Sequence, residues 1–261
     1  MNRTPIQPDL SAIPEVFHPL LTGCPVFDSS CSPEARVIYL EKDGGLYLKS
    51  ARKGSLKQEA EMDAYFASFG LGPEVLVYHT EEADWLLTRA VKGEDCLHPD
   101  YLADPDRLAE TIAQMLFDLH HREYSACPVQ HHTERYISRA VENRKAGRYD
   151  ASLFPDNWGF YSAEETWSVV ESHAKYLKAD TLLHGDYCLP NIMLDKWQPS
   201  GFIDVGGGGV GDKHVDLFWG AWTLKFNLKD DRYVTRFLDA YGRNNFEPEM
   251  LRVIAAVESF L

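Results

Sequence analysis

Two short stretches, HGDYCLPNIM at residues 184–193 and SGFIDVG at residues 200–206, are the most informative part of this sequence. The first stretch places Asp186 two residues after a histidine and Asn191 five residues after Asp186. The second places Asp204 at the end of a short apolar run, two residues before a glycine run. Two carboxylates and one amide therefore fall within one short part of the chain. Such a set indicates chemistry that needs oxygen ligands and a base.

Phosphoryl transfer from ATP needs this kind of set. The reaction requires metal ions on the phosphates, an acceptor hydroxyl in line, and a group that takes its proton. In kinase catalytic loops an Asp follows a His-x pair and an Asn lies five residues later, while the Asp of a D-x-G turn binds a second metal ion. The sequence therefore predicts Asp186 as the base. It also predicts Asn191 and Asp204 as Mg²⁺ ligands, because Mg²⁺ prefers oxygen donors.

Residues 1–89 have the pattern of a small β-sheet with one helix. Two β-rich runs at 36–40 and 45–50 flank the turn KDGG, which is typical of a hairpin. Ser55 and Gln58 have the spacing of a capping box, and apolar residues then recur at helical spacing until Gly70. Two further strands are expected at 75–78 and 85–88.

Residues 90–261 have a mainly helical pattern. Asp104 is expected to cap a helix that has Pro105 at its first position. Further helices are expected near 133–147, 163–178, 213–225, 231–241 and 247–260. The sequence thus predicts an α+β, bilobal protein-kinase-like fold, with a nucleotide-binding lobe at 1–89 and a catalytic and substrate-binding lobe at 90–261. A cleft between two such lobes is the usual place for a ligand.

Composition narrows the class of partner. The chain has 261 residues, 44% of them hydrophobic, which is ample for a globular core. The net charge of −14 disfavours nucleic acid and anionic membranes and favours a cationic small molecule. Five cysteines without a C-x-x-C pair are expected to be free thiols. The start has no apolar signal segment, so a cytoplasmic location is expected.

The phosphate-binding lysine should lie in the small lobe. Lys49 is on the predicted strand at 45–50, and a glutamate of the following helix should hold it. Glu59 lies about 60° and Glu61 about 100° from the centre of the apolar stripe. Glu59 is therefore preferred as the partner, and Glu61 remains an alternative.

The linked motifs strongly resemble the aminoglycoside 3'-phosphotransferases, of the wider aminoglycoside phosphotransferase and choline kinase superfamily. HGDYCLPNIM, SGFIDVG and DKHVDL match the family best, and LYLK, LLTRA and DNW match more weakly. The resemblance implies an enzyme that uses ATP and Mg²⁺ to phosphorylate a hydroxyl of an aminoglycoside antibiotic. It implies the roles given above for Asp186, Asn191 and Asp204. It also implies nucleotide contacts at Lys49, Glu59, Ser32, Thr88 and Ala90, and acceptor contacts at Asp156 and Glu258.

Several residues depart from the family pattern. Gly207 replaces a usual arginine after D-x-G, and Gly211 replaces a usual alanine. Trp222 stands where an arginine is common, and Phe226 and Asn227 stand where acidic acceptor contacts are expected. These differences leave the reaction unchanged, but they concern the side that binds the acceptor.

Three alternatives remain open beside this prediction. The acceptor could be another hydroxylated metabolite or antibiotic, the chain could be a silent nucleotide-binding module, or it could release phosphate to water as a metal-dependent hydrolase. Gly206, Gly208 and Gly211 also fit the G-x-G-x-x-G pattern of dinucleotide sites, but no βαβ unit surrounds them. A monomer or weak homodimer is expected. The choice between ATP and GTP and the hydroxyl modified are left open.

Overall fold

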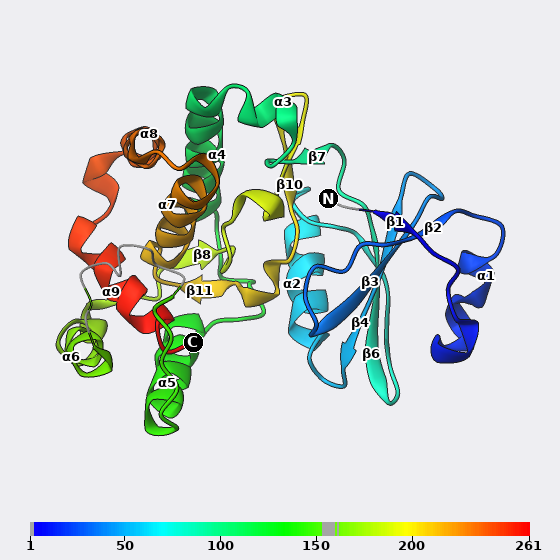
Figure 1. The fold of residues 1–261 in the computed structure, drawn as a ribbon, viewed down its shortest axis with the longest axis horizontal. Coiled ribbons are helices and arrows are strands. Elements are labelled where there is room, and N and C mark those ends of the chain that lie inside the picture. Colours follow the sequence, from blue (N-terminus) through cyan, green and yellow to red (C-terminus); the bar gives the residue numbers. More distant parts are fainter. Residues whose placement is uncertain (1–2, 153–159, 161) are drawn as a thin grey trace. The chain divides into compact units, whose positions relative to one another are not determined.

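The computed structural model describes residues 3–152, 160 and 162–261. The chain divides into two compact units (Figure 1). Unit 1 is Met1–Cys96 with Pro190–Gly206, and unit 2 is Leu97–Leu189 with Gly207–Leu261. Unit 1 is built on antiparallel sheets and unit 2 is mainly helical, which confirms the predicted fold class. Unit 1 takes in the whole predicted lobe 1–89. It also takes in the later segment that bears Asn191 and Asp204.

The main sheet of unit 1 has six antiparallel strands in the order β1-β2-β3-β4-β6-β5. The predicted hairpin is confirmed as β3 and β4, which pair Val37 with Lys49 and Leu40 with Leu46. The two later strands are also confirmed, and β6 pairs with both β4 and β5. The strand bounds are β1 Thr4–Pro5, β2 Val26–Asp28, β3 Ala35–Leu40, β4 Leu46–Arg52, β5 Val75–Thr80 and β6 Ala83–Arg89.

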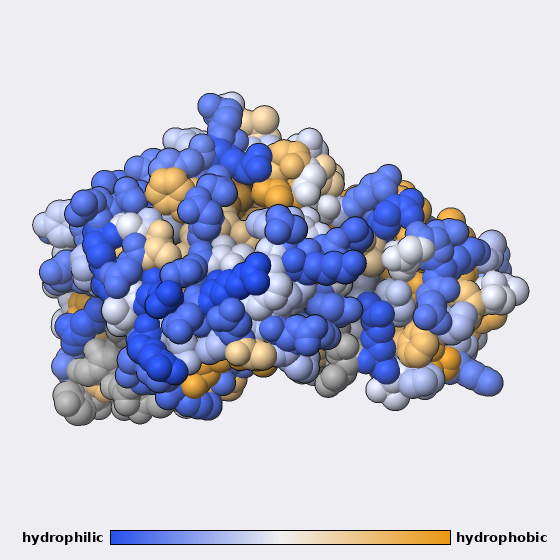
Figure 2. All heavy atoms as spheres, turned by 90° about the horizontal axis from the view of Figure 1, so that it is seen from above, coloured by the Kyte–Doolittle hydropathy of each residue, from blue (hydrophilic) through white to orange (hydrophobic). Residues whose placement is uncertain are grey.

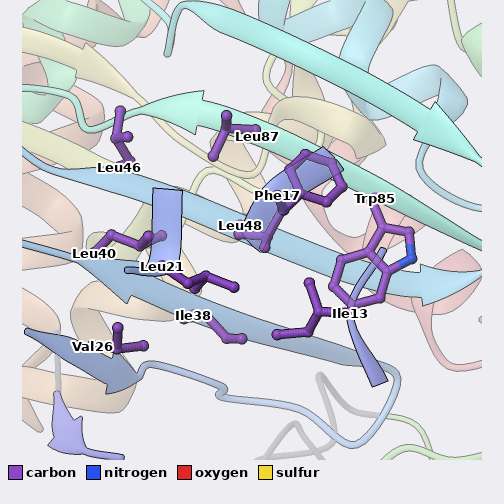
Figure 3. Packing of buried hydrophobic residues seen from close by; sticks show 10 residues of the cluster. All are labelled: Ile13, Phe17, Leu21, Val26, Ile38, Leu40, Leu46, Leu48, Trp85 and Leu87. Carbon is purple, nitrogen blue, oxygen red and sulfur yellow. The ribbon is translucent and has the colours of Figure 1, made fainter. Parts of the chain in front are cut away.

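One face of this sheet is closed by the N-terminal segment. Side chains alternate between the two faces along a strand, so Ile38 and Leu48 share a face that excludes Lys49. On that face they pack with Ile13 and Phe17, which come from the stretch around η2 (Glu15–Phe17) and α1 (His18–Leu21). Figure 3 shows the cluster, which also includes Leu21, Val26, Leu40, Leu46, Trp85 and Leu87. The opposite face is left for Lys49 and its partners.

Helix α2 (Lys57–Ala67) follows β4, as expected, but its start was predicted wrongly. Ser55 Oγ donates to the carbonyl of Arg52, and Gln58 Nε2 donates to the carbonyl of Gly206 at 2.6 Å, so no capping box forms. The buried carboxylate of Asp84 accepts the amide hydrogen of Leu56 at 3.0 Å instead. A strand residue distant in sequence thus satisfies the orphan donor at the helix start.

A second, three-stranded sheet completes unit 1, in the order β10-β9-β7. Its strands are β7 (Glu94–Asp95), β9 (Ile192–Asp195) and β10 (Gln198–Phe202). Asn191 comes just before β9 and Asp204 just after β10. Because β9 and β10 pair antiparallel, the hairpin brings Asp204 back close to Asn191.

Unit 2 is a helical assembly around one small strand pair, β8 (Thr181–Leu183) with β11 (Gly209–Gly211). Asp104 caps α4 through the amide of Arg107, and Pro105 is the first helical residue, as predicted. Helix α8 packs on α4 and α7, and α9 packs on α6 and α7. The helix bounds are α3 Pro99–Leu102, α4 Pro105–His120, α5 His132–Lys145, α6 Ala163–His173, α7 His214–Leu228, α8 Asp231–Tyr241 and α9 Pro248–Glu258.

The surface and the cysteines complete the description. Figure 2 shows a face of the molecule that is mostly hydrophilic, with apolar residues in small separate patches. All five cysteines are free, as expected. In the part of the chain that the structure describes, no helix is both long enough and apolar enough to cross a bilayer.

Candidate active site

Lys49 is the centre of the charged site in unit 1. Its Nζ donates to Glu59 Oε1 at 2.7 Å and Oε2 at 2.9 Å, and to Asp204 Oδ1 at 2.8 Å. Lys49 comes from β4, Glu59 from the first turn of α2, and Asp204 from the end of the second hairpin. The preference for Glu59 over Glu61 is borne out by this contact, since Glu61 lies 3.8 Å from Lys57 instead. Strand, helix and hairpin thus meet at one ammonium group.

Electrostatics keep this ammonium charged. Burial alone would lower the pKa of Lys49, but the carboxylates of Asp204 and Glu59 outweigh it and hold that pKa above its ordinary value. Burial raises the pKa of Glu59, and Lys49 opposes this. Asp63, one turn further along α2, is 2% exposed, and burial raises its pKa well above the ordinary value. Burial and the neighbouring carboxylates thus disfavour a third negative charge beside Lys49.

Asp204 and Asn191 have the chemistry of a Mg²⁺ site within unit 1. The amide of Ile203 donates to the carbonyl of Asn191 at 3.0 Å, which brings the two candidate ligands to neighbouring positions. Asp204 has a φ of 55°, a conformation that few side chains adopt and that marks functional turns. Its side chain is 53% exposed although Lys49 binds one oxygen, so the carboxylate can also face a ligand. One carboxylate and one amide, completed by phosphate oxygens, fit Mg²⁺.

Replacing Glu59 by glutamine should lower kcat/KM for ATP by about tenfold, mainly through KM. The amide cannot supply the charge that fixes the Lys49 ammonium, and charge-assisted hydrogen bonds are roughly twice as strong as neutral ones. Steady-state kinetics with varied ATP would measure the effect. The matched control is Glu61→Gln, two residues away and 48% exposed, which should stay within about twofold of the wild type. Equal effects of the two substitutions would contradict the assignment.

The other predicted nucleotide contacts lie in unit 1 at different places. Thr88 is buried in β6 and pairs with Tyr47 of β4, which shares its sheet face with Lys49. Tyr47 was not identified as a site residue from the sequence. It could have been found because residues two apart on a strand share a face, and Tyr47 lies two residues before Lys49. The amide hydrogen of Ala90 donates to the carbonyl of Gly45, so a bound base would have to use the carbonyl of Ala90. Ser32 is exposed in the turn between β2 and β3.

In unit 2, Asp186 follows β8 and is exposed in a loop whose other side chains are mostly buried. Its backbone amide donates to His184 Nδ1 at 3.2 Å, which agrees with a structural rather than a basic role for this histidine. Gly185 has a φ of 89°, and a Cβ on it would lie 2.2 Å from the backbone carbon of Gly207. The loop therefore packs directly against the glycine run, and glycine is required at position 185.

Asp216, from the motif DKHVDL, supports the same loop and was missed as a site residue. Its buried carboxylate accepts the amides of His184 at 2.7 Å and Gly185 at 2.8 Å. Burial would raise the pKa of Asp216, but hydrogen bonds, the one with His120 foremost, hold it below its ordinary value. Burial lowers the pKa of His120, so this ring is neutral and contacts both Asp216 and Tyr241. Asp216 is an anionic clamp that orients the loop bearing Asp186.

Glu258 lies in unit 2 with two donors on one oxygen. Tyr136 Oη donates to Glu258 Oε1 at 2.8 Å, and Trp219 Nε1 donates to the same atom at 3.0 Å. Burial raises the pKa of Glu258 to about 7, and the negative charge of Asp186 adds to that rise. Glu258 is thus a carboxylate within electrostatic reach of Asp186. The other predicted acceptor contact, Asp156, lies outside the described residues.

The predicted site residues fall in both units. Unit 1 brings Lys49, Glu59 and Asp204 into contact and places Asn191 beside them, while unit 2 holds Asp186 and Glu258. The meeting of Asp186 with the two candidate metal ligands stays a prediction. The fold and the site nevertheless define a class: a kinase-like phosphotransferase with a strand lysine, a helix glutamate and a D-x-G aspartate.

Comparison with known proteins agrees with that class. Residues 32–254 match the model of the phosphotransferase enzyme family, and the chain belongs to this family. It is 41% identical over 260 residues to a "Probable aminoglycoside 3'-phosphotransferase" of Lactococcus lactis subsp. lactis, covering 99% of each chain.

Two solved structures are similar in fold. An aminoglycoside 3'-phosphotransferase of type VIII superimposes with a TM-score of 0.74 at 26% identity, covering 92% of this chain and 94% of that one. An aminoglycoside phosphotransferase of Streptomyces rimosus, in complex with ADP and streptomycin, gives a TM-score of 0.71 at 22% identity. That pair covers 86% of this chain and 90% of the other.

Proposed function

We propose that this protein transfers the γ-phosphoryl group of ATP to a hydroxyl of an aminoglycoside and thereby inactivates the antibiotic. The observation that carries the proposal is the Lys49 ammonium held between Glu59 and Asp204, because a fixed, fully charged lysine serves the phosphates of a nucleotide. The 41% identity to the Lactococcus lactis protein, and the ADP and streptomycin bound to the Streptomyces rimosus protein, support the same substrates.

The residues divide the work between nucleotide and acceptor. Lys49 binds phosphate oxygens, and Tyr47 and Thr88 lie on its sheet face where a base can pack. Asp186, at the tip of the clamped loop, accepts the proton of the acceptor hydroxyl as its oxygen forms a bond to phosphorus and the bond to the ADP oxygen breaks. Asp216 keeps the loop in place. An added phosphate then gives the drug negative charge and bulk, which weakens its binding to ribosomal RNA.

Magnesium would be held by Asn191 and Asp204. When bound, it neutralises charge on the transferring phosphates. The chain's own part is to offer one amide oxygen and one half-exposed carboxylate at neighbouring positions. A monomer or weak homodimer and a cytoplasmic location stay predictions.

Incubating the purified protein with γ-labelled ATP, Mg²⁺ and a panel that includes kanamycin and streptomycin tests the proposal. We expect label on at least one drug and little phosphate release without a drug. Label on another hydroxylated compound alone would reject the acceptor class but retain the reaction. Phosphate release at the same rate with and without every acceptor would indicate a hydrolase. Binding of ATP with neither label transfer nor phosphate release would indicate a silent module.

Acceptor binding should weaken as the pH falls through about 7, because Glu258 then takes up a proton and can no longer pair with an ammonium group. The KM of the acceptor should rise from pH 8.5 to pH 5.5, while Glu258→Gln should have a high KM with little pH dependence. The KM of ATP serves as the internal control. An acceptor KM with the same pH dependence in both proteins would contradict this role.

Glu258 affects the stability of the fold with the opposite pH dependence: a rise in pH favours acceptor binding but lowers the free energy of unfolding. Its folded pKa of about 7 lies above the ordinary value of 4.5, so the folded state holds a proton that the unfolded state has released between those pH values. The free energy of unfolding therefore falls as the pH rises through this window. Glutamine retains an acceptor oxygen for Tyr136 and Trp219. Glu258→Gln should raise Tm more at pH 8 than at pH 5, as thermal denaturation would measure.

A further inference from the structure

Helix α7 carries a row of three aromatic side chains, Trp219, Trp222 and Phe226. Their spacing of three and four residues places them along one side of the helix. The rings of Trp219 and Trp222 meet edge to face, with centroids 5.3 Å apart and planes at 79°. The rings of Trp222 and Phe226 are stacked, with centroids 4.8 Å apart and planes at 13°. The row therefore presents ring edges, together with the parts of the ring faces that neighbouring rings leave uncovered.

One end of this row lies at the candidate active site. Trp219 donates its indole N–H to Glu258, the carboxylate that senses the charge of Asp186. On the same helix, Thr223 Oγ1 accepts the amide hydrogen of Leu189, the last residue of the Asp186 loop in unit 2, at 3.2 Å. The aromatic row thus runs along α7 beside the segment that anchors this loop.

The other end of the row is open to solvent and carries positive charge. Phe226 is 49% exposed, which is unusual for so large an apolar side chain in an otherwise packed helix. The ammonium of Lys229, the residue directly after α7, lies 4.4 Å from the centroid of the Phe226 ring. Lys225, one turn earlier, binds the carboxylate of Asp231 at 2.6 Å. A lysine ammonium thus lies against the Phe226 ring and repels a second cation.

The charge along the aromatic row changes from negative at one end to positive at the other. A carboxylate lies at the Trp219 end, stacked rings lie in the middle, and a lysine lies at the Phe226 end. An ammonium group is favoured beside Glu258 and disfavoured beside Lys229. An uncharged sugar ring is favoured in between, because its C–H face can pack on an aromatic ring and bury apolar area.

We propose that Trp222 and Phe226 form a stacking wall of the acceptor site, which takes the uncharged C–H face of one sugar ring while Glu258 takes a single ammonium group of the same molecule. The inference rests on the proposed function and narrows its substrate class. The acceptor is a glycoside with its positive charge concentrated at one end, rather than a molecule charged on every ring. Stacking supplies the affinity that additional carboxylates would supply at a polycation site.

A charge substitution separates the two kinds of site by the sign of its effect. Phe226→Glu should raise the acceptor KM about tenfold, because it removes a ring face and pairs with Lys229. At a polycation site the same substitution would lower KM, since it adds a carboxylate. Trp222→Ala should also raise the acceptor KM about tenfold, and Trp222→Phe should restore most of it. The kcat and the KM of ATP should change by less than about threefold.

Each variant is tested with kanamycin and with streptomycin. Kinetics gives the KM of the acceptor, and calorimetric titration gives its Kd. Tyr176→Ala is the matched control, since Tyr176 is an exposed aromatic residue of unit 2, 60% exposed, outside this row. It should leave both constants unchanged. Thermal denaturation of each variant confirms that it is folded.

The outcomes distinguish this inference from the proposed function. Label transfer by the wild type, with KM unchanged by Trp222→Ala or lowered by Phe226→Glu, overturns the stacking wall alone. If the wild type binds a drug without transferring phosphate, loss of that binding in Trp222→Ala still supports the wall. Absence of any drug binding to the folded wild type overturns both.

Discussion

Asp186→Ala should lower kcat by a factor of about 10² to 10⁴, the usual effect of removing a positioned general base. Asp186 is exposed, and the backbone just before it is held by the Asp216 carboxylate. Loss of its side chain removes the proton acceptor and leaves these backbone contacts of the loop in place. The Kd of ATP should stay within about threefold, because the lysine that serves the phosphates is in the other unit.

Single-turnover measurement of label transfer, with ATP binding followed by calorimetry, separates chemistry from binding. Asp186→Asn should lose nearly as much activity as the alanine variant, because the amide keeps the shape but cannot accept the proton. Asp100→Ala is a suitable control, since this aspartate of unit 2 has a side chain that is 82% exposed. Retention of more than about a third of wild-type kcat in Asp186→Asn would remove this residue from the role of base.

Lys49→Ala should lower kcat/KM for ATP by about 10² to 10³, comparable to the loss of one preorganised electrostatic donor. The substitution removes a phosphate contact and leaves the carboxylates of Glu59 and Asp204 without their shared counter-charge. The pKa of Glu59, which burial raises and Lys49 lowers, should then rise further. Because the Lys49 and Glu59 side chains are 21% and 14% exposed, the free energy of unfolding should fall by about 1 to 3 kcal/mol, less than for a fully buried pair.

Kinetics with varied ATP and urea denaturation would measure the two effects separately. Lys49→Arg should keep most of the stability, because the charge is retained, but little of the activity, because a planar guanidinium does not replace a point charge. Lys57→Ala is the control, since its side chain is 69% exposed. Full activity of the arginine variant would show that this site needs only a positive charge.

The sequence was informative where chemistry or periodicity is local. Phosphoryl transfer demands fixed spacings, so Asp186, Asn191 and Asp204 could be singled out from the linked motifs alone. The helical period separated Glu59 from Glu61, and the contact with Lys49 agrees with that choice. Strand and helix positions followed from hydrophobic alternation and turn residues, which depend on neighbours in the chain.

The missed features depend on contacts between distant residues. The cap of α2 comes from Asp84, 28 residues after Leu56, so the local Ser55–Gln58 pattern suggested the wrong acceptor. The Asp216 clamp acts on a residue 32 positions earlier in the chain. Short N-terminal elements close one face of the main sheet, yet none is long enough to show a clear period. Local patterns indicate which side chains face inward, but they do not identify the distant partner.

The packing of the Asp186 loop on the glycine run makes the two positions unequal under antibiotic selection. A Cβ at position 185 would collide with the backbone of Gly207, whereas a Cβ at position 207 would find its nearest neighbours at 3.6 Å, an ordinary distance. In a population that survives only by modifying the drug, codon 185 should be invariant while codon 207 drifts. Of these two packed positions, only position 207 can therefore accept a side chain and vary among resistant isolates.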